Sequence, residues 1–250
     1  MFSLTETAVK SQLVPKTIIS YSMKVMCGRF ARKSTQKVLA DWFGVALEEM
    51  PWFAPSYNAA PQSFQPVVRL DRDSGKRAIS LLRWGLVPFW AKEAKIGFST
   101  INARAEEAAS KPAYREALKK RRCLVPADDF YEWQRPDPKT KRPFAFALKS
   151  GEPYAFAGLW ESWRPKDGEP LETFTILTTG PNEIMAPIHN RMPVILEPKD
   201  YDRWLDAGDP ATPPVDLLRP YPAERMTAWP VGVRVGNVRN NDPELLEPVL

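Results

Sequence analysis

The chain has 250 residues, of which 44% are hydrophobic and 26% charged, and its formal net charge is +5. This length allows one sizeable core or at most two small ones, so the chain should fold without a partner. The modest positive charge favours an anionic partner, but it is also common among soluble proteins and excludes little.

The N-terminal part contains one clear helix. Residues 1–25 are mixed and lack periodicity, so we interpret them as a leader that is disordered or absent from the mature protein. Ser34 is a good N-cap, and Gly44 stands where a helix would end. The apolar residues between them fall on one helical face. They are Val38, Leu39, Trp42 and Phe43.

A hairpin and a broken helix follow. The strand-like runs 66–70 and 77–84 flank turn-forming residues, which predicts a hairpin. A helical pattern covers 106–122, but Pro112 suits a first helical turn better than a helix interior. We therefore predict that the helix restarts at Pro112.

The remaining sequence is dominated by strands. Runs of β-branched and aromatic residues, separated by turn formers, favour antiparallel sheet. These runs are 123–134, 144–149, 154–163 and 172–179, followed by a short helix at 198–207 and a last strand pair at 226–238. No linker separates two halves. We predict one α+β domain over 26–250, mainly an antiparallel, barrel-like sheet with flanking helices.

The cysteine count and the apolar runs bear on location. Cys27 and Cys123 allow one disulfide at most, which fits a reducing cytoplasm better than secretion. Residues 1–25 lack the pattern of a signal peptide, and no stretch reaches about 18 apolar residues. We expect a cytoplasmic protein without a membrane span.

Cys27 follows Met26, and this pair suggests a reactive terminus. An initiator methionine is readily removed ahead of a small residue, so a start at Met26 would expose Cys27. Its α-amine, with a reference pKa of about 7.7 to 8.0, would be nucleophilic near neutral pH. Such an amine and thiol together condense with an aldehyde to a thiazolidine ring. The alternatives are a buried structural cysteine, the commonest fate of a free thiol, and an inert thiol at the surface.

Three other residues are candidates for proton transfer or positioning. His189 is the only histidine, and loop-to-strand junctions such as the one before 194–196 often carry functional groups. The alternative is a structural, hydrogen-bonded histidine. Glu132 lies between two aromatic residues on a strand; its position alone favours an outward-facing acid, whereas burial would raise its pKa. Asn102 is either a turn residue or an amide that positions an aldehyde or hydroxyl.

Arginines and aromatic residues near these motifs favour single-stranded nucleic acid. Arginines for phosphates and aromatic faces for unstacked bases recur in proteins that bind single strands. The stretch 84–90 would form a stacking wall, although most tryptophans belong to cores. The residues concerned are Arg29, Arg104, Arg191, Trp84, Phe89, Trp90 and Trp133.

Metal and cofactor sites are not indicated. Two cysteines and one histidine fall short of the four protein ligands of a structural zinc site. The glycine-containing segments match neither a phosphate loop nor a dinucleotide fingerprint. We expect no metal and no cofactor.

Seven motifs occur in order from Met26 onward. They are MCGRF at 26–30, YNAAP at 57–61, RWGLVP at 83–88, INARAE at 101–106, FYEW at 130–133, HNRMP at 189–193 and VGNV at 235–238. Together they resemble the SRAP family, the SOS-response-associated peptidases, also called abasic-site processing proteins. The resemblance implies a single SRAP domain that binds single-stranded DNA and crosslinks its N-terminal cysteine to the ring-opened aldehyde of an abasic site.

The resemblance also implies roles for individual residues. Cys27 would form the thiazolidine, Asn102 would hold the abasic sugar, and Glu132 would transfer protons to or from the amine and sugar. His189 would assist ring opening, Schiff-base formation or reversal. The implied DNA-contacting positions are Arg29, Asn58, Pro61, Phe89, Trp90, Arg104, Trp133 and Thr178. We expect a monomer that associates with the nucleoid on DNA damage.

Residues 1–25 depart from the family pattern, because an amide nitrogen at Cys27 cannot form the imine. Either Met26 is the true start, which we favour, or the leader is removed, by the protein itself through Cys27, Glu132 and His189. Two other functions stay open at this point. One is a thiol peptidase acting on itself or on other proteins, and the other is a non-catalytic binder of single strands.

Overall fold

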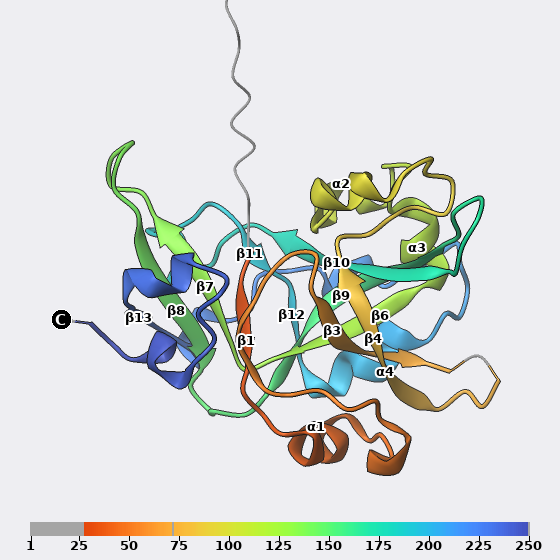
Figure 1. The fold of residues 1–250 in the computed structure, drawn as a ribbon, viewed down its shortest axis with the longest axis horizontal. Coiled ribbons are helices and arrows are strands. Elements are labelled where there is room, and N and C mark those ends of the chain that lie inside the picture. Colours follow the sequence, from red (N-terminus) through yellow and green to blue (C-terminus); the bar gives the residue numbers. More distant parts are fainter. Residues whose placement is uncertain (1–27, 72, 250) are drawn as a thin grey trace, which may run out of the picture.

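A computed structural model describes residues 28–71 and 73–249, and a closed barrel of five strands forms its centre (Figure 1). Around the barrel the strands follow the order β10-β4-β3-β6-β9, and pairing of β9 with β10 closes it. Closure leaves no free sheet edge among these strands. Their bounds are β3 (Phe64–Leu70), β4 (Arg77–Trp84), β6 (Arg122–Ala127), β9 (Tyr154–Trp163) and β10 (Leu171–Thr179).

The barrel is mixed, because two strands run parallel to β10. One is β4, and the other is the short β5 (Asn102–Arg104), which pairs with the end of β10. The other barrel pairings are antiparallel. Two further short strands, β11 (Met192–Pro193) and β12 (Ile195–Leu196), extend β10 and β9. The predicted α+β class and barrel-like sheet are therefore confirmed.

A second sheet of five strands packs against the barrel. Its order is β13 (Met226–Pro230), β8 (Arg142–Leu148), β7 (Asp129–Gln134), β1 (Phe30–Arg32) and β2 (Ser56–Ala59). Phe30, Phe130 and Phe146 on one face join Phe156 of the barrel in a buried aromatic cluster. The other face is covered by C-terminal residues, with Val235 and Leu245 buried against Tyr131.

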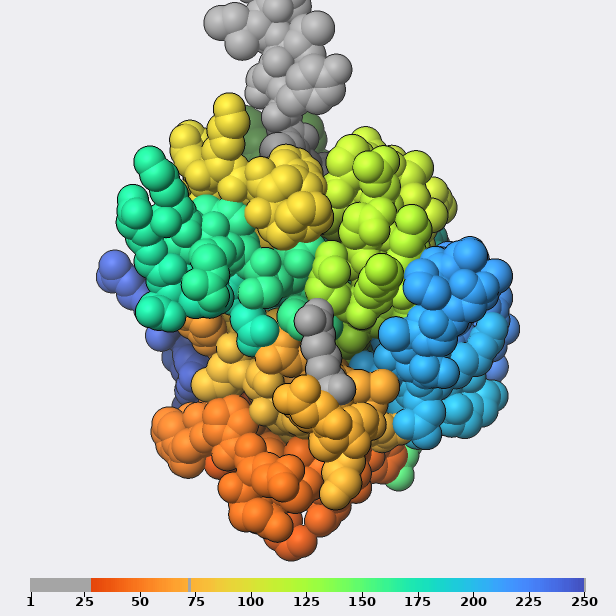
Figure 2. Space-filling model, turned by 90° about the vertical axis from the view of Figure 1, so that its right-hand side faces the viewer, coloured from red at the N-terminus to blue at the C-terminus, as the bar shows by residue number. Residues whose placement is uncertain are grey.

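Four short α-helices flank the sheets: α1 (Gln36–Phe43), α2 (Ala105–Ala108), α3 (Arg115–Lys120) and α4 (Tyr201–Leu205). On α1, Phe43 stacks on Tyr201 of α4 with 5.5 Å between ring centres, so both helices share one apolar cluster with the barrel. In Figure 2, α1 lies at the bottom of the face shown, below the β3–β4 hairpin. No helix within the described ranges is long and apolar enough to cross a membrane.

The predicted start of α1 is wrong by one residue, whereas its end is confirmed. Thr35, not Ser34, is the N-cap, and its hydroxyl accepts a hydrogen bond from the Val38 N–H at 3.4 Å. Ser34 instead donates its hydroxyl to Asp128. Gly44 ends the helix in the left-handed region, with φ 65°. Val38, predicted on the apolar face, is 43% exposed.

Three other predicted elements are corrected by the structure, while the hairpin of β3 and β4 is confirmed. The helix does not restart at Pro112 but at Arg115, after a turn. The run 123–134 is two strands in different sheets, β6 and β7, which meet at Asp128. The expected strand pair at 226–238 is a single strand, β13, followed by a short 3-10 helix.

The close approach of β6 and β9 makes Gly158 a test of barrel packing. A Cβ atom there would lie 2.8 Å from the Cys123 Sγ and 2.9 Å from a methyl carbon of Val125. Gly158→Ala should therefore lower the free energy of unfolding by about 1–3 kcal/mol, measured by urea denaturation. Gly180→Ala is the control, because no atom lies within 4 Å of its added Cβ. Equal unfolding midpoints for both variants would contradict this packing.

Candidate active site

Glu132 and His189 share one pocket of about 570 Å³. The pocket lies between the start of β1, the end of β7 and the loop that carries His189. Gly28 also lines it, and Cys27, the residue before Gly28, lies outside the described residues. The full lining is Gly28, Arg29, Glu132, Trp133, Gln134, Arg135, Pro136, Lys141, Ala186, Pro187, Ile188, His189, Asn190 and Gly236.

Glu132 is buried, so its interpretation as an outward-facing acid is wrong. Its residue is only 2% exposed. Along β7 it follows Phe130 on the same face of the strand, since side chains alternate, and Phe130 packs in the aromatic cluster. Its cross-strand neighbour on β8 is Phe144. Glu132 thus continues a row of buried aromatic side chains, which places a carboxylate at the inner wall of the pocket.

The loop after β10 holds His189. The backbone N–H of Arg191 donates to the His189 Nδ1 at 3.2 Å, and the Arg191 carbonyl oxygen lies 3.1 Å from the same nitrogen. When Nδ1 accepts this hydrogen bond, the neutral ring carries its proton on Nε2. Gln134, at the end of β7, donates its side-chain amide to the Pro187 carbonyl at 3.2 Å. The loop and β7 are therefore tied together across the pocket.

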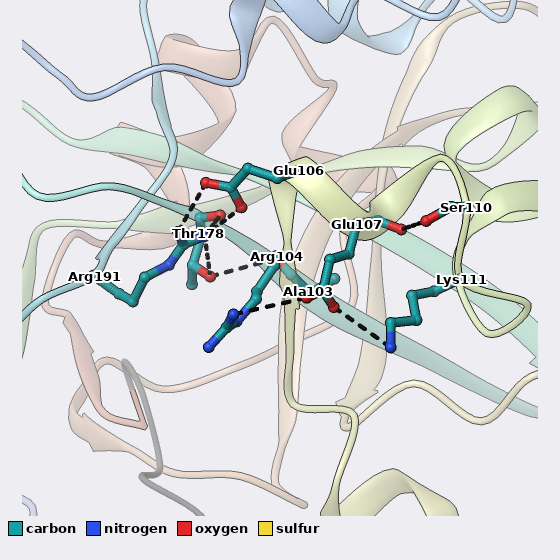
Figure 3. Close-up of polar contacts among 8 residues, drawn as sticks. All are labelled: Ala103, Arg104, Glu106, Glu107, Ser110, Lys111, Thr178 and Arg191. Carbon is teal, nitrogen blue, oxygen red and sulfur yellow. Dashed lines mark hydrogen bonds and ion pairs between the residues drawn. The ribbon is translucent and has the colours of Figure 1, made fainter.

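Arg191 fixes the other end of this loop (Figure 3). Its guanidinium donates two hydrogen bonds to the Glu106 carboxylate, at 2.8 and 2.9 Å, and one to the Thr178 carbonyl at 2.5 Å. The hydrogen bonds from Arg191 lower the pKa of Glu106. Bidentate arginine–carboxylate pairs are geometrically specific. Arg191 therefore serves to anchor the loop, and its side chain is only 13% exposed.

Arg29, which directly precedes β1, lines the pocket and is held by neutral acceptors. It donates to the Asn58 Oδ1 at 3.0 Å, to the Val235 carbonyl at 2.8 Å and to the Gly236 carbonyl at 3.2 Å. Burial lowers the pKa of its guanidinium. No carboxylate pairs with Arg29 among residues 28–71 and 73–249. The Arg29 guanidinium thus stands beside Gly28 with carbonyl and amide oxygens as its acceptors.

Asn58 links Arg29 to the C-terminal segment by hydrogen bonds. Its side-chain amide donates to three carbonyls of the C-terminal segment, those of Val235, Asn237 and Asn240. The residue is 5% exposed. The motif at 235–238 therefore contributes backbone carbonyls as hydrogen-bond acceptors. A pattern of side chains in the sequence does not predict such contacts.

Asn102 lies in a second hollow, which we call the Asn102 groove, of about 410 Å³. β5 places it beside Ile176 of β10, and the Tyr114 hydroxyl donates to its carbonyl at 3.2 Å. The structure thus brings Asn102 together with Trp90 and Arg104 along this groove. The groove is lined by Trp90, Asn102, Arg104, Glu107, Lys111, Pro112, Ala113 and Tyr114.

The other predicted contact positions differ in exposure. Phe89 and Trp90 are 57% and 49% exposed, but Trp84 is fully buried and donates its indole N–H to the Ile101 carbonyl. The predicted stacking wall at 84–90 is therefore reduced to its last two residues. Thr178 is buried, with its hydroxyl directed to the Ala103 carbonyl at 3.4 Å (Figure 3). Pro61 and Trp133 are half-buried.

The thiol of Cys123 is buried and unreactive. Its thiol is buried in the barrel, and burial raises its pKa far above the ordinary value. A thiolate is the reactive form of cysteine, so this thiol is not a nucleophile at neutral pH. Within the described ranges, no group of three or more histidine, cysteine or acidic residues is placed to hold a metal ion.

The sequence analysis missed the two basic residues that line the pocket beyond Arg29. Arg135 and Lys141 lie at its rim, on the turn between β7 and β8. The signal was present as a cluster of basic residues in a predicted turn. Their relation to Glu132 depends on which strands pair, and so it becomes visible only in the fold.

Comparison with known proteins gives one consistent result. The profile of the family described as SOS response associated peptidase (SRAP) matches residues 26–238. The chain is 45% identical over 227 residues to the abasic site processing protein YoqW of Bacillus subtilis, covering 89% of this chain and 99% of that protein. It is 39% identical over 228 residues to the abasic site processing protein HMCES of Gallus gallus, covering 79% and 67%.

A solved structure resembles the fold closely. A crystal structure of a protein from Bacteroides thetaiotaomicron superposes with a TM-score of 0.79 at 26% identity, covering 90% of this chain and all of that one.

Proposed function

The chain belongs to the SRAP family, and from this premise we propose that it processes abasic sites in single-stranded DNA by forming a covalent crosslink. Relatives at 45% and 39% identity bear the name abasic site processing protein. The observation that carries the proposal is the shared pocket of Gly28, Glu132 and His189. We further propose that the SRAP domain covers 26–250, that 1–25 are not part of the mature protein, and that removal of Met26 leaves Cys27 as its first residue.

We propose that Cys27 reaches this pocket, because it directly precedes Gly28 in the chain. Consecutive Cα atoms are about 3.8 Å apart, and Gly28 itself lines the pocket. The terminal amine of Cys27 would therefore be within reach of an aldehyde bound beside Glu132 and His189. A buried carboxylate and an imidazole are the two side-chain types best suited to move protons near neutral pH.

The proposed reaction has two bond-forming steps. The Cys27 amine attacks the aldehyde carbon of the ring-opened sugar, and loss of one water gives the imine. The thiol sulfur then adds to the imine carbon while its proton passes to the nitrogen, closing the thiazolidine. Glu132 would transfer protons at the amine and the departing oxygen, and His189 would assist ring opening of the sugar. Asn102, from its neighbouring groove, would hold the sugar.

The remaining contact positions would hold the DNA strand. Arg29 and Arg104 offer positive charge, and Phe89 and Trp90 offer exposed aromatic faces. Stacking of bases on aromatic side chains is worth about 1–3 kcal/mol per base. Asn58 would act through Arg29, while Pro61, Trp133 and Thr178 would shape the surface.

Mass spectrometry tests this function directly. Protein that begins at Cys27 should form a heat-stable adduct with a single strand containing one abasic site. The mass of the adduct should equal the sum of protein and DNA minus one water. An undamaged strand is the control. Absence of an adduct, or an adduct of unreduced mass, would overturn the proposal.

A second activity is favoured by one observation, the presence of 26 residues before Cys27. We propose that, where translation begins at Met1, the protein hydrolyses the bond between Met26 and Cys27, using the Cys27 thiol with Glu132 and His189. The intact mass of full-length protein measured over time tests this. Conversion to the mass of 27–250 is expected, and its persistence at full length would contradict self-cleavage.

A further inference from the structure

The turn between β7 and β8 concentrates positive charge. It joins Gln134 to Arg142, and in Figure 1 it stands out from the second sheet. Four cations lie on it, all exposed, and none forms an ion pair with a residue of the described ranges. They are Arg135, Lys139, Lys141 and Arg142, which together we call the basic turn.

The acid within the turn, Asp137, forms no ion pair with these cations in the described ranges, and its carboxylate binds the backbone instead. The Asp137 carboxylate accepts hydrogen bonds from the N–H groups of Lys139 and Thr140, both at 2.8 Å. Hydrogen bonds from Thr140 and Lys139 lower the pKa of Asp137. Such a local arrangement orders a turn. The backbone of the basic turn is therefore ordered, and its four cations are exposed to solvent.

Its position relates the basic turn to the proposed active site. Arg135 and Lys141 line the same pocket as Glu132 and His189. The base of the turn is fixed to the His189 loop by the hydrogen bond from Gln134 to the Pro187 carbonyl. Arg135 follows Glu132 by three residues, which is about 10 Å at the rise of a strand. The turn therefore begins at the pocket lining, with Arg135 and Lys141, and its tip stands out from the second sheet (Figure 1).

An exposed cluster of cations is most often only a solvated face, but this one has two distinguishing features. Four cations outnumber the single acid Asp137, so like charges repel one another in the turn and a polyanionic ligand would relieve this repulsion. It also borders the pocket in which a polyanion would bind under the function proposed above. A single strand of DNA supplies regularly spaced phosphates on both sides of any nucleotide.

We infer that the basic turn binds phosphates of the DNA strand flanking the abasic nucleotide, and so supplies affinity that is independent of the lesion. This inference rests on the proposed function. It assigns DNA contacts to Arg135, Lys139 and Lys141, in addition to those expected from the family resemblance. Binding of the flanking strand would hold the abasic sugar at the pocket while the covalent bond forms.

Salt dependence of binding to an undamaged single strand of about 20 nucleotides tests this inference without any crosslink. The variant replaces Arg135, Lys139 and Lys141 by alanine in the full chain. Each lost phosphate contact on a single strand should reduce the slope of log K against log salt by about 0.7, so by about 2 in total. Between about 50 and 200 mM salt, wild-type affinity should therefore fall roughly 15-fold more than that of the variant.

A matched variant separates local contact from overall charge. Lys76, Arg164 and Lys166 are exposed cations without an ion pair in the described ranges, and they lie on the β3–β4 and β9–β10 turns, at the side opposite the basic turn (Figures 1 and 2). Replacing these three by alanine lowers the net charge equally, from +5 to +2. This control should keep a slope close to that of wild type.

The outcomes distinguish this inference from the proposed function. Equal slopes for the two triple variants, or a basic-turn variant that binds like wild type, would overturn the inference while leaving adduct formation intact. Adduct formation at saturating protein is measured on the same variants with an abasic strand. If wild type forms no adduct but the basic-turn variant still shows the reduced slope, the proposed chemistry fails and the DNA contact stands.

Discussion

Replacing Cys27 by alanine in protein that begins at residue 27 is expected to abolish the heat-stable adduct with abasic DNA. The α-amine remains in this variant and still forms an imine, but no thiol is present to close the ring. The imine hydrolyses on heating. Adduct yield on a denaturing gel, taken to completion for wild type, should therefore fall below detection for Cys27→Ala.

Reduction with borohydride provides the control for Cys27→Ala. It converts the imine to a stable amine, so the variant should be trapped by DNA in the presence of the reductant. Protein that retains residues 1–26 should form neither the adduct nor the trapped species, because its Cys27 nitrogen is an amide. Equal heat-stable crosslinking by Cys27→Ala and wild type without reductant would refute the role of the thiol.

Glu132→Gln is expected to slow crosslinking by about 10²–10⁴-fold, the range for loss of a general acid or base. Glutamine keeps the shape of the side chain at this buried position but cannot exchange protons with the amine or the sugar oxygen. Single-turnover adduct formation at saturating protein measures the rate. Affinity for an undamaged strand should change little, because Glu132 is 2% exposed and adds no surface charge.

Glu183→Gln is the matched control for Glu132→Gln. Glu183 is exposed and lies outside the pocket lining, and its substitution changes the net charge by the same amount. It should crosslink at the wild-type rate. Thermal unfolding of both variants checks that the fold is retained. Rates of Glu132→Gln within twofold of wild type would remove this residue from the chemistry.

Local signals in the sequence were sufficient for many elements. The hairpin of β3 and β4 was predictable because two strand-like runs flank a dense group of turn formers. Gly44 ended α1 as expected, since only glycine adopts the left-handed conformation without cost. The strand bounds of β9 coincide with the predicted run 154–163. In each case the information lies within about ten neighbouring residues.

Long-range pairing could not be inferred in the same way. The run 123–134 has one uniform pattern, yet Asp128 divides it between the barrel and the second sheet. The burial of Glu132 follows from β7 lying between β1 and β8, a fact of the tertiary fold. The parallel pairing of β5 with β10 joins residues about seventy positions apart and leaves no periodic mark in either segment.

The grouping of the candidate residues was likewise only partly predictable. Family resemblance selected Glu132 and His189 together, and the fold places both on one pocket. The same reasoning grouped Asn102 with them; Asn102 lines the Asn102 groove, and its role at the sugar stays a prediction. Arg191 resembled a DNA contact in sequence, but its guanidinium is engaged by Glu106 and Thr178. Sequence identifies such residues by type, and only packing determines what they touch.

The hydrogen bonds from Arg29 to the C-terminal segment have a consequence for biosynthesis. The hydrogen bond from Arg29 to the Val235 carbonyl spans 206 positions of the chain. Ribosomes add about 5–20 residues per second, so Arg29 emerges many seconds before its acceptors exist. A nascent polypeptide therefore lacks these contacts of Arg29, and with them the finished wall of the pocket, until residues 235 and 236 have been added.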